Sequence, residues 1–232
     1  VRVFPKYDDP ELLKVGNPYL RPQFTTAYEL AIQQDWGSLN ASLALYHRTI
    51  KDAYQRIYSI DQSSGTYDIV NKIYSNTGKA SNTGGELIAH WKADKTLKLN
   101  ASLNAFRIRR DPANVTLLFP YVRIVTLSPS SDFTWDGKLG VEAALGKSTK
   151  MQLNGVYYAA RDIAQGSQAA RSALDLSLSR TFAKDRIKAS LSATDIFNSF
   201  GSKTTVNGVG FDALYENYYE TQAVMLSVEF KI

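Results

Sequence analysis

Apolar and polar residues alternate with a period of two along most of the chain. Between 97 and 105, the odd positions are Leu or Ala and the even positions are Lys, Asn or Ser. The same scheme returns at 39–45, 174–179, 187–192 and 224–232. Successive side chains of a β-strand point to opposite faces, so this period predicts strands with one apolar face. The chain is therefore predicted to be all-β.

Nine strands are expected from this pattern. They run over 24–34, 38–58, 67–93, 96–109, 131–145, 150–162, 170–182, 186–198 and 217–232. Strands of soluble domains usually have about 5–6 residues, and most of these are much longer. A tilted strand that crosses a bilayer needs about 9–11 residues, so the lengths favour a membrane-spanning sheet.

The connections between these strands alternate in length. The short ones are Asp35–Gly37, Asp94–Lys95, Gly146–Thr149 and Ala183–Arg186, and the long ones are Ser59–Thr66, Arg110–Ser130, Ala164–Ala169 and Ser199–Glu216. Membrane barrels have short periplasmic turns and long extracellular loops. The sequence therefore predicts an antiparallel transmembrane β-barrel whose first strand descends from outside. An odd number of strands with this start requires further strands upstream, so residues 1–232 are expected to be the C-terminal portion of a larger barrel.

Composition narrows the function classes. The longest wholly apolar stretch, near Leu117–Val122, is far shorter than the roughly 18–20 residues of a membrane helix. No cysteine is present, which argues against a disulfide framework, thiolate metal sites and thiol catalysis. The net charge is only +5 and no basic cluster is dense enough to indicate nucleic-acid binding. No charged-then-apolar leader follows Val1, so an exported chain of this sequence is expected to be a mature form or a fragment.

Alternation alone leaves open whether the apolar face meets lipid or a protein core. A soluble β-sandwich or lipocalin-like binding module would turn it inward, whereas a barrel turns it outward. Aromatic residues near the strand ends suggest the girdles of a membrane barrel. The candidates are Tyr28, Trp36, Tyr46, Tyr54, Tyr58, Tyr74, Trp91, Tyr157 and Tyr158.

Several segments resemble motifs of one family. Gly16–Gln23 with the following Tyr28-Glu29-Leu30 resembles the G-N-P-x-L-x-P-E…Y-E-L segment of TonB-dependent outer-membrane receptors, although Gln23 stands where that pattern has Glu. Further similar segments are Asn76–Gly78 with Gly84–Leu87, Thr194–Asn198, and the closing Val228–Ile232. The last resembles the C-terminal signal read by the barrel-assembly machinery, but its aromatic residue, Phe230, lies two residues before the end.

The resemblance implies a 22-stranded barrel of which this chain supplies the last nine strands. A plug domain and the segment that contacts the TonB complex would lie upstream, outside this chain. The implied function is import of a scarce nutrient, such as a ferric siderophore or another small-molecule or glycan ligand, across the outer membrane of a Gram-negative bacterium. Outer-membrane lipid and lipopolysaccharide are further expected partners, and no cofactor is expected. A passive porin or structural barrel stays open as an alternative.

Catalysis is not expected. The two histidines, His47 and His90, are far apart, and the sequence has no Ser/His/Asp order, metal-ligand spacing or phosphate loop. The best ligand-binding candidates surround the longest connection: Arg107, Arg109, Arg110, Tyr121 and Arg123. Arg and Tyr suit an anionic chelate through charge-assisted hydrogen bonds and ring contacts. A solvated or lipopolysaccharide-facing loop, with arginines on the phosphates, explains the same residues.

Overall fold

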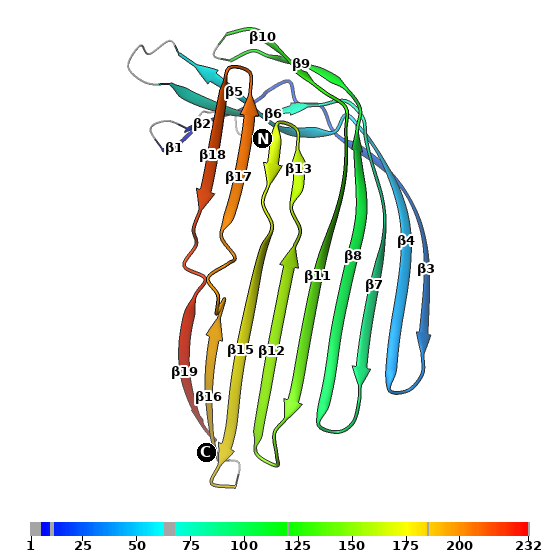
Figure 1. Ribbon diagram of the computed structural model, residues 1–232, viewed down its shortest axis with the longest axis vertical. Helices are drawn as coiled ribbons and strands as arrows, with labels where there is room; N and C mark the ends of the chain where they lie inside the picture. The colour runs from blue at the N-terminus through cyan, green and yellow to red at the C-terminus, as the bar shows by residue number, and fades with distance from the viewer. Residues whose placement is uncertain (1–5, 10–11, 63–67, 120, 185, 232) are drawn as a thin grey trace.

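The computed structural model describes residues 6–9, 12–62, 68–119, 121–184 and 186–231. Nine of its strands form one antiparallel sheet in the order β19-β16-β15-β12-β11-β8-β7-β4-β3 (Figure 1). These strands are β3 (Phe24–Asp35), β4 (Leu39–Lys51), β7 (Ala80–Lys92), β8 (Leu97–Arg110), β11 (Ser130–Ala144), β12 (Thr149–Tyr158), β15 (Arg171–Phe182), β16 (Ile187–Thr194) and β19 (Ala223–Phe230). The prediction of an all-β, antiparallel nine-stranded sheet is confirmed. None of the described residues belongs to a helix that is long and apolar enough to cross a membrane.

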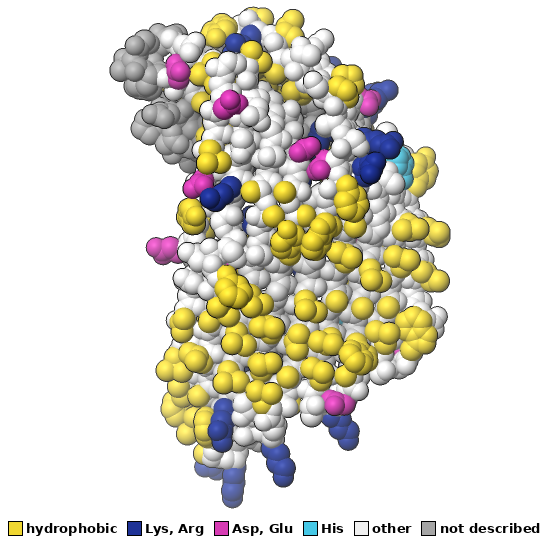
Figure 2. Space-filling model, viewed as in Figure 1, with side chains coloured by type: hydrophobic (Ala, Val, Ile, Leu, Met, Phe, Trp, Pro, Cys, Tyr) yellow, Lys and Arg dark blue, Asp and Glu magenta, His cyan; other side chains and the backbone are white. Residues whose placement is uncertain are grey.

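One face of this sheet is apolar and stays exposed. Leu43, Leu87 and Leu103 lie side by side in the register of β4, β7 and β8, and the pattern continues to Leu178 of β15 and Leu226 of β19. The exposed fractions of these last two are 42% and 71%. Figure 2 shows this face as a broad belt of apolar side chains. A soluble sandwich or lipocalin-like module buries its apolar face, so that alternative does not fit, and the belt is the surface that meets lipid.

Aromatic residues border the belt at both ends. Tyr28, Phe133, Trp135 and Tyr157 lie toward the long connections, and Trp36, Trp91, Phe182 and Phe230 lie toward the short turns. From Leu99, which pairs with Trp91, to Arg107, which pairs with Phe133, β8 rises about 27 Å. At a tilt of about 40° this is about 20 Å along the membrane normal, close to the usual apolar band of a barrel.

Only some of the predicted girdle residues lie in these two rows. Tyr28, Trp36, Trp91 and Tyr157 do. Tyr46 and Tyr158 point to the opposite face of the sheet, because they alternate with outward neighbours. The other three, Tyr54, Tyr58 and Tyr74, lie beyond the sheet.

The short connections are tight turns, as predicted. Gly37 and Gly146 have φ angles of +77° and +133°, which favour glycine. In the turn after β7, the Asp94 carboxylate accepts hydrogen bonds from the hydroxyl and amide of Thr96, at 2.7 and 2.6 Å, and from the amide of Leu97. These bonds hold the pKa of Asp94 below its usual range. In the predicted turn 183–186, Asp185 lies outside the described residues, as does Ile232 at the end of the last predicted strand.

The long connections contain regular structure that the alternation did not predict. Each contains a hairpin: β5 (Tyr54–Asp61) with β6 (Ile69–Asn76), β9 (Ala113–Leu117) with β10 (Arg123–Leu127), β13 (Arg161–Ile163) with β14 (Gly166–Gln168), and β17 (Ser202–Gly208) with β18 (Phe211–Asn217). The predicted single strands 38–58 and 67–93 are therefore wrong, because each is divided between the sheet and a hairpin. Residues 63–66 of the predicted connection lie outside the described part. Two further strands, β1 (Lys6–Asp9) and β2 (Leu12–Val15), join the sheet of β6 and β5.

These hairpins pack on one another and form the extracellular layer, the name used below for β5, β6, β9, β10, β13, β14, β17 and β18. Its core consists of Ile57, Ile73, Val115, Leu117, Val125 and Leu127, with Ala164 packed against it. The amide of Tyr58 donates to Oε1 of Gln165 at 2.7 Å, Nε2 of Gln165 donates back to the Tyr58 carbonyl at 3.2 Å, and the Tyr58 ring stacks on Tyr215. Figure 1 shows β5 and β6 lying across the top of the molecule beside β17 and β18. The β5–β6 hairpin thus reaches from β4 and β7 to the hairpins near the other side of the sheet.

Candidate functional site

The β5–β6 hairpin leaves the sheet at a hydrogen-bonded bend. Asp52 and Gly78 have φ angles of +53° and +84° there. The amide of Ala53 donates to the Gly78 carbonyl at 2.8 Å, and the amide of Thr77 donates to the Ala53 carbonyl at 2.6 Å. The hydrogen-bond ladder between the two antiparallel segments, one joining β4 to β5 and the other joining β6 to β7, therefore continues through the bend while its direction changes.

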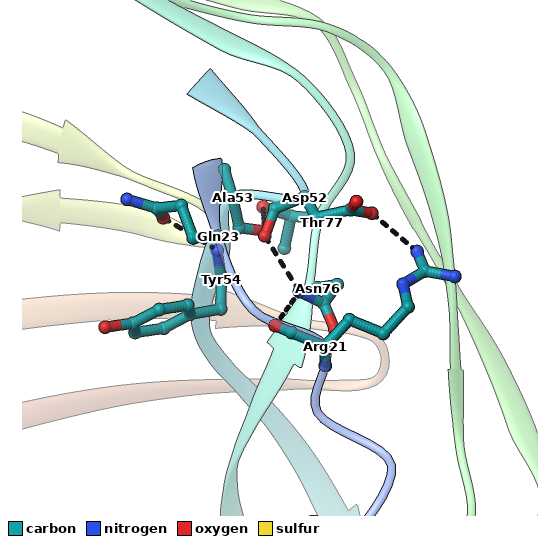
Figure 3. Close-up of polar contacts among 7 residues, drawn as sticks. All are labelled: Arg21, Gln23, Asp52, Ala53, Tyr54, Asn76 and Thr77. Atoms are coloured by element: carbon teal, nitrogen blue, oxygen red, sulfur yellow. Dashed lines mark hydrogen bonds and ion pairs between the residues drawn. The ribbon is translucent and has the colours of Figure 1, made fainter. Parts of the chain in front are cut away.

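The segment 16–23, which carries the receptor-like motif, is anchored on this bend. The Asn76 side chain donates to the carbonyls of Asp52 and Arg21, at 2.8 and 3.1 Å, and accepts from the Arg21 amide at 2.8 Å (Figure 3). The Arg21 guanidinium pairs with the Asp52 carboxylate at 2.7 Å. Gln23, at the position where the family pattern has Glu, accepts from the Tyr54 amide at 3.3 Å. The motif residues thus hold the hairpin in its bent position.

Between this segment and the hairpin lies a cavity of about 660 Å³, called the basic cavity below. Its lining is Lys14, Gly16, Asn17, Leu20, Arg21, Pro22, Tyr54, Arg56, Lys72 and Tyr74. Four of these side chains are cationic and two are tyrosines, and no Asp or Glu of the described part of the chain is among them. A cavity of this size is in the range of small-molecule sites, and its composition suits an anionic ligand.

Arg56 is held in position by aromatic partners. Its Nε donates to the Tyr74 hydroxyl at 2.8 Å, and its guanidinium carbon lies 5.4 Å from the Tyr74 ring centre. Tyr74 in turn meets Tyr54 edge to face, with ring centres 6.0 Å apart. Burial works against the charge of Arg56, but the hydrogen bond to Tyr74 and the interactions with Tyr74 and Tyr58 raise its pKa above the usual value. Arg56 therefore offers a fixed, permanently charged guanidinium to the cavity.

Lys72 lies opposite Tyr58 on the hairpin, on the same face as Arg56 and two positions along the register. Its ammonium is 5.9 Å from the centre of the Tyr58 ring. Burial raises the pKa of the Tyr58 hydroxyl, an effect that nearby Arg56 partly opposes, so this tyrosine stays neutral. The aromatic side chains thus supply ring contacts without adding negative charge.

A second cavity of about 500 Å³ shares Gly16, Asn17 and Arg21 with the first. Its other walls come from β6 and from β9 with the residues after it: Ile73, Ser75, Asn76, Asn114, Val115, Thr116, Leu117, Leu118 and Phe119, together with Pro18 and Tyr19. The segment 16–23 therefore separates two cavities of the extracellular layer.

The structure distributes the five predicted site residues over three places. Arg107 and Arg109 have the parity of Leu103 and lie on the outward face of β8, whereas Arg110 faces the other way and donates to Ser130 and to the Asp162 carbonyl. Tyr121 and Arg123 lie near the Ile60 carbonyl, with the Arg123 guanidinium 5.4 Å from the Tyr121 ring. None of the five lines either cavity of the extracellular layer. A role for them in ligand binding stays a prediction.

The residues of the basic cavity were not among the candidates, although the sequence contains a signal for them. On β5, every second residue is aromatic or cationic: Tyr54, Arg56 and Tyr58, with the buried Ile57 between the last two. On β6, Tyr74 and Lys72 lie opposite Arg56 and Tyr58 in the register. Such an alternation of aromatic and cationic residues marks one face of a hairpin. It was hidden because the segment was interpreted as part of a long spanning strand.

The segment Thr194–Asn198, also similar to a receptor motif, forms a turn after β16. The Asp195 carboxylate accepts from the amides of Ser199 and Phe200 and from the Thr221 hydroxyl, at 3.0, 3.2 and 2.6 Å. Burial alone would raise the pKa of Asp195, but these bonds lower it below the usual value. Asp195 therefore fixes the chain between β16 and β17 as a carboxylate. Among the described residues, no group of three or more His, Cys, Asp or Glu could hold a metal ion.

An antiparallel sheet with an exposed apolar belt, aromatic borders, short turns at one end and hairpins at the other defines an outer-membrane β-barrel protein. The chain belongs to the outer membrane protein beta-barrel family, whose model matches residues 1–230. Its place is accordingly the outer membrane of a Gram-negative bacterium.

Two solved structures have a similar fold. The siderophore receptor PirA from Acinetobacter baumannii matches with a TM-score of 0.55 and 14% identity over 94% of this chain. The FrpB iron transporter from Neisseria meningitidis matches with a TM-score of 0.49 and 15% identity over 93%. This chain spans about a third of those chains, 33% and 32% respectively. No curated protein sequence matches it.

Proposed function

We propose that this chain is the C-terminal part of the barrel of a TonB-dependent receptor, and that the basic cavity binds an anionic nutrient such as a ferric siderophore at the extracellular side. The observation that carries the proposal is the basic cavity itself, with four cations and two tyrosines on a hydrogen-bonded frame. Charge-assisted hydrogen bonds and ring contacts suit an anionic aromatic chelate. The fold similarity to a protein described as a siderophore receptor supports the assignment.

The open edges of the sheet fit the same proposal. Within the described residues, β3 and β19 each pair on one side only. A sheet in lipid cannot leave its backbone groups unpaired, so membrane sheets close into barrels. In the proposed receptor, further strands of the same polypeptide pair with both edges, and a plug upstream couples release of the ligand to TonB.

The test uses the full-length protein in cells that lack other iron receptors. We expect accumulation of radioactive iron from an anionic tris-catecholate chelate, dependent on TonB and on the proton-motive force, and little accumulation from a neutral tris-hydroxamate chelate. Arg56→Gln is expected to raise the half-saturating concentration about tenfold, which corresponds to about 1.4 kcal/mol, and Arg56→Lys to recover part of the loss.

Arg123→Gln is the matched control, because Arg123 lies in the extracellular layer but outside both cavities. A loss of uptake with Arg123→Gln and none with Arg56→Gln would move the site to the longest connection. Ion conductance in planar bilayers without saturable, energy-dependent uptake would instead indicate a passive porin.

A further inference from the structure

A group of basic side chains lies on the outward face of the sheet, just beyond the apolar belt on the side of the extracellular layer. It consists of His47 and Lys51 of β4 and Arg107 and Arg109 of β8, and is called the outer basic patch below. Figure 2 shows Lys and Arg side chains and a histidine gathered above the apolar belt. All four side chains are exposed.

The strand register fixes which way the patch faces. Tyr28, His47, Thr83, Arg107 and Phe133 follow one another across five strands. Tyr28 and Phe133, at the two ends of this row, are exposed members of the aromatic border. Arg107 therefore lies at the level of that border.

The adjoining row toward the extracellular layer is polar. It contains Thr26, Thr49, Ser81, Arg109 and Ser131. Arg107 and Arg109 are roughly 7 Å apart along the strand. His47 shares hydrogen bonds with Thr83 at 2.8 Å and Thr49 at 3.4 Å. The cations are thus set among hydroxyl groups at the level where lipid headgroups begin.

The acidic side chains of the sheet at this height lie on the face opposite the outer basic patch. The carboxylates of Glu29, Glu86 and Asp132 have the opposite parity to the patch and face away from lipid. Arg110, which lies on the same face as these carboxylates, donates hydrogen bonds to Ser130 and to the Asp162 carbonyl. By contrast, no described residue forms an ion pair or hydrogen bond with the side chains of Arg107, Arg109 or Lys51. The outward cations therefore have no anionic partner within the described chain.

We propose that the outer basic patch binds the phosphate groups of lipopolysaccharide in the outer leaflet. A guanidinium group can donate two parallel hydrogen bonds to the oxygens of one phosphate. Arg107 and Arg109, together with the hydroxyl groups of Thr83 and Ser81 on the neighbouring strand, can therefore contact one phosphorylated headgroup. Basic residues beside a membrane surface recognise anionic headgroups in this way. The acyl chains of the same lipid lie against the belt below. The inference does not depend on which ligand the barrel transports.

The test is lipid binding by the full-length protein, purified free of lipopolysaccharide and measured by native mass spectrometry with diphosphorylated lipid A. We expect Arg107→Gln with Arg109→Gln to weaken binding at least tenfold, and replacement of both by Lys, which keeps the charge but not the paired hydrogen bonds, to recover only part of the loss. Dephosphorylated lipid A is expected to bind the unaltered protein as weakly as diphosphorylated lipid A binds the double Gln variant. Migration of the folded form on unheated gels checks that each variant folds.

Arg180→Gln is the matched control. Arg180 also lies on the outward face, above the Phe182 ring at 5.2 Å, but at the end of β15 near the short turns. It faces the inner leaflet, so its loss should leave lipid A binding unchanged. Equal binding of lipid A with and without phosphates, or no effect of the double Gln variant, would overturn the proposal. So would loss of nutrient uptake with unchanged lipid binding, which would return both arginines to the ligand site.

Discussion

The spanning sheet and the extracellular layer use the same alternation of residues with opposite results. In the sheet the apolar side chains face outward, so that 42% of Leu178 is exposed. In the extracellular layer they face inward, so that only 1% of Leu117 is exposed. Both leucines lie on antiparallel strands. The comparison teaches that period two specifies a strand with two unlike faces, and that the surrounding solvent decides which face is covered.

The largest effect is expected from the core of the extracellular layer. Leu117→Ala should destabilise this layer by about 2–5 kcal/mol, because it removes most of a buried leucine side chain and leaves a cavity in the core. The matched control is Leu118→Ala, since 51% of Leu118 is exposed. Hydrogen exchange of the full-length protein in micelles measures the effect: amides of β5, β6 and β9 should exchange faster only in Leu117→Ala. Equal exchange in both variants would show that the layer has no core of its own.

The stability of the spanning sheet should depend on the charge of its lipid-facing side chains more than on their volume. Leu178→Arg is expected to cost about 2–4 kcal/mol, as for cations on the lipid face near the bilayer centre. Ser177→Arg, one residue away on the opposite face, should cost less than about 1 kcal/mol. Urea titration of the barrel folded into lipid vesicles measures both. Similar losses from the two variants would mean that Leu178 does not face lipid.

The Asp195 turn joins the two regions and should depend on pH. Asp195→Ala removes hydrogen bonds to a charged group and is expected to cost about 1.5–3 kcal/mol. Because the folded pKa of Asp195 is lowered, its contribution is present above the unfolded pKa of about 3.9 and is lost as the pH falls through the folded value. Thermal unfolding between pH 7 and pH 3 measures this dependence. The same dependence on pH in the Asp195→Ala variant and in the unaltered protein would contradict this prediction.

The smallest of these effects is expected where the β5–β6 hairpin meets β14. Gln165→Ala removes two hydrogen bonds to the Tyr58 backbone and leaves those groups buried without partners, at a cost of about 1–3 kcal/mol. Gln168→Ala, which loses a single long contact to Ser202, should cost less. Limited proteolysis within 54–76 measures release of the hairpin. Equal protection in both variants would mean that the bend alone holds it.

The sheet was predictable because its signal is repeated and uninterrupted. The nine strands and their antiparallel order follow from alternation and from connection lengths. The extracellular layer was missed because its strands are short and their alternation runs on from the sheet. The bend at Asp52 and Gly78 depends on two positive φ angles and on Asn76, none of which interrupts the period.

The positions of the predicted site residues show the same limit. Arg107 and Arg109 continue the parity of Leu99, Ala101 and Leu103, so the sequence itself places them outward, but their nearness to the longest connection suggested a ligand site. The basic cavity joins residues of β2, the segment 16–23, β5 and β6. Contacts between segments this far apart depend on the bend, and alternation contains no information about it.

The bond between Tyr58 and Gln165 joins residues that are 107 positions apart. Each pairing within the nine-stranded sheet joins residues that are much closer in sequence, even where a hairpin lies between the two strands. Fixing the β5–β6 hairpin to residue 165 therefore closes a much longer loop than any pairing within the spanning sheet, at a higher cost in chain entropy. The Tyr58–Gln165 contact is consequently the long-range tie that makes the extracellular layer one unit instead of a set of separate hairpins.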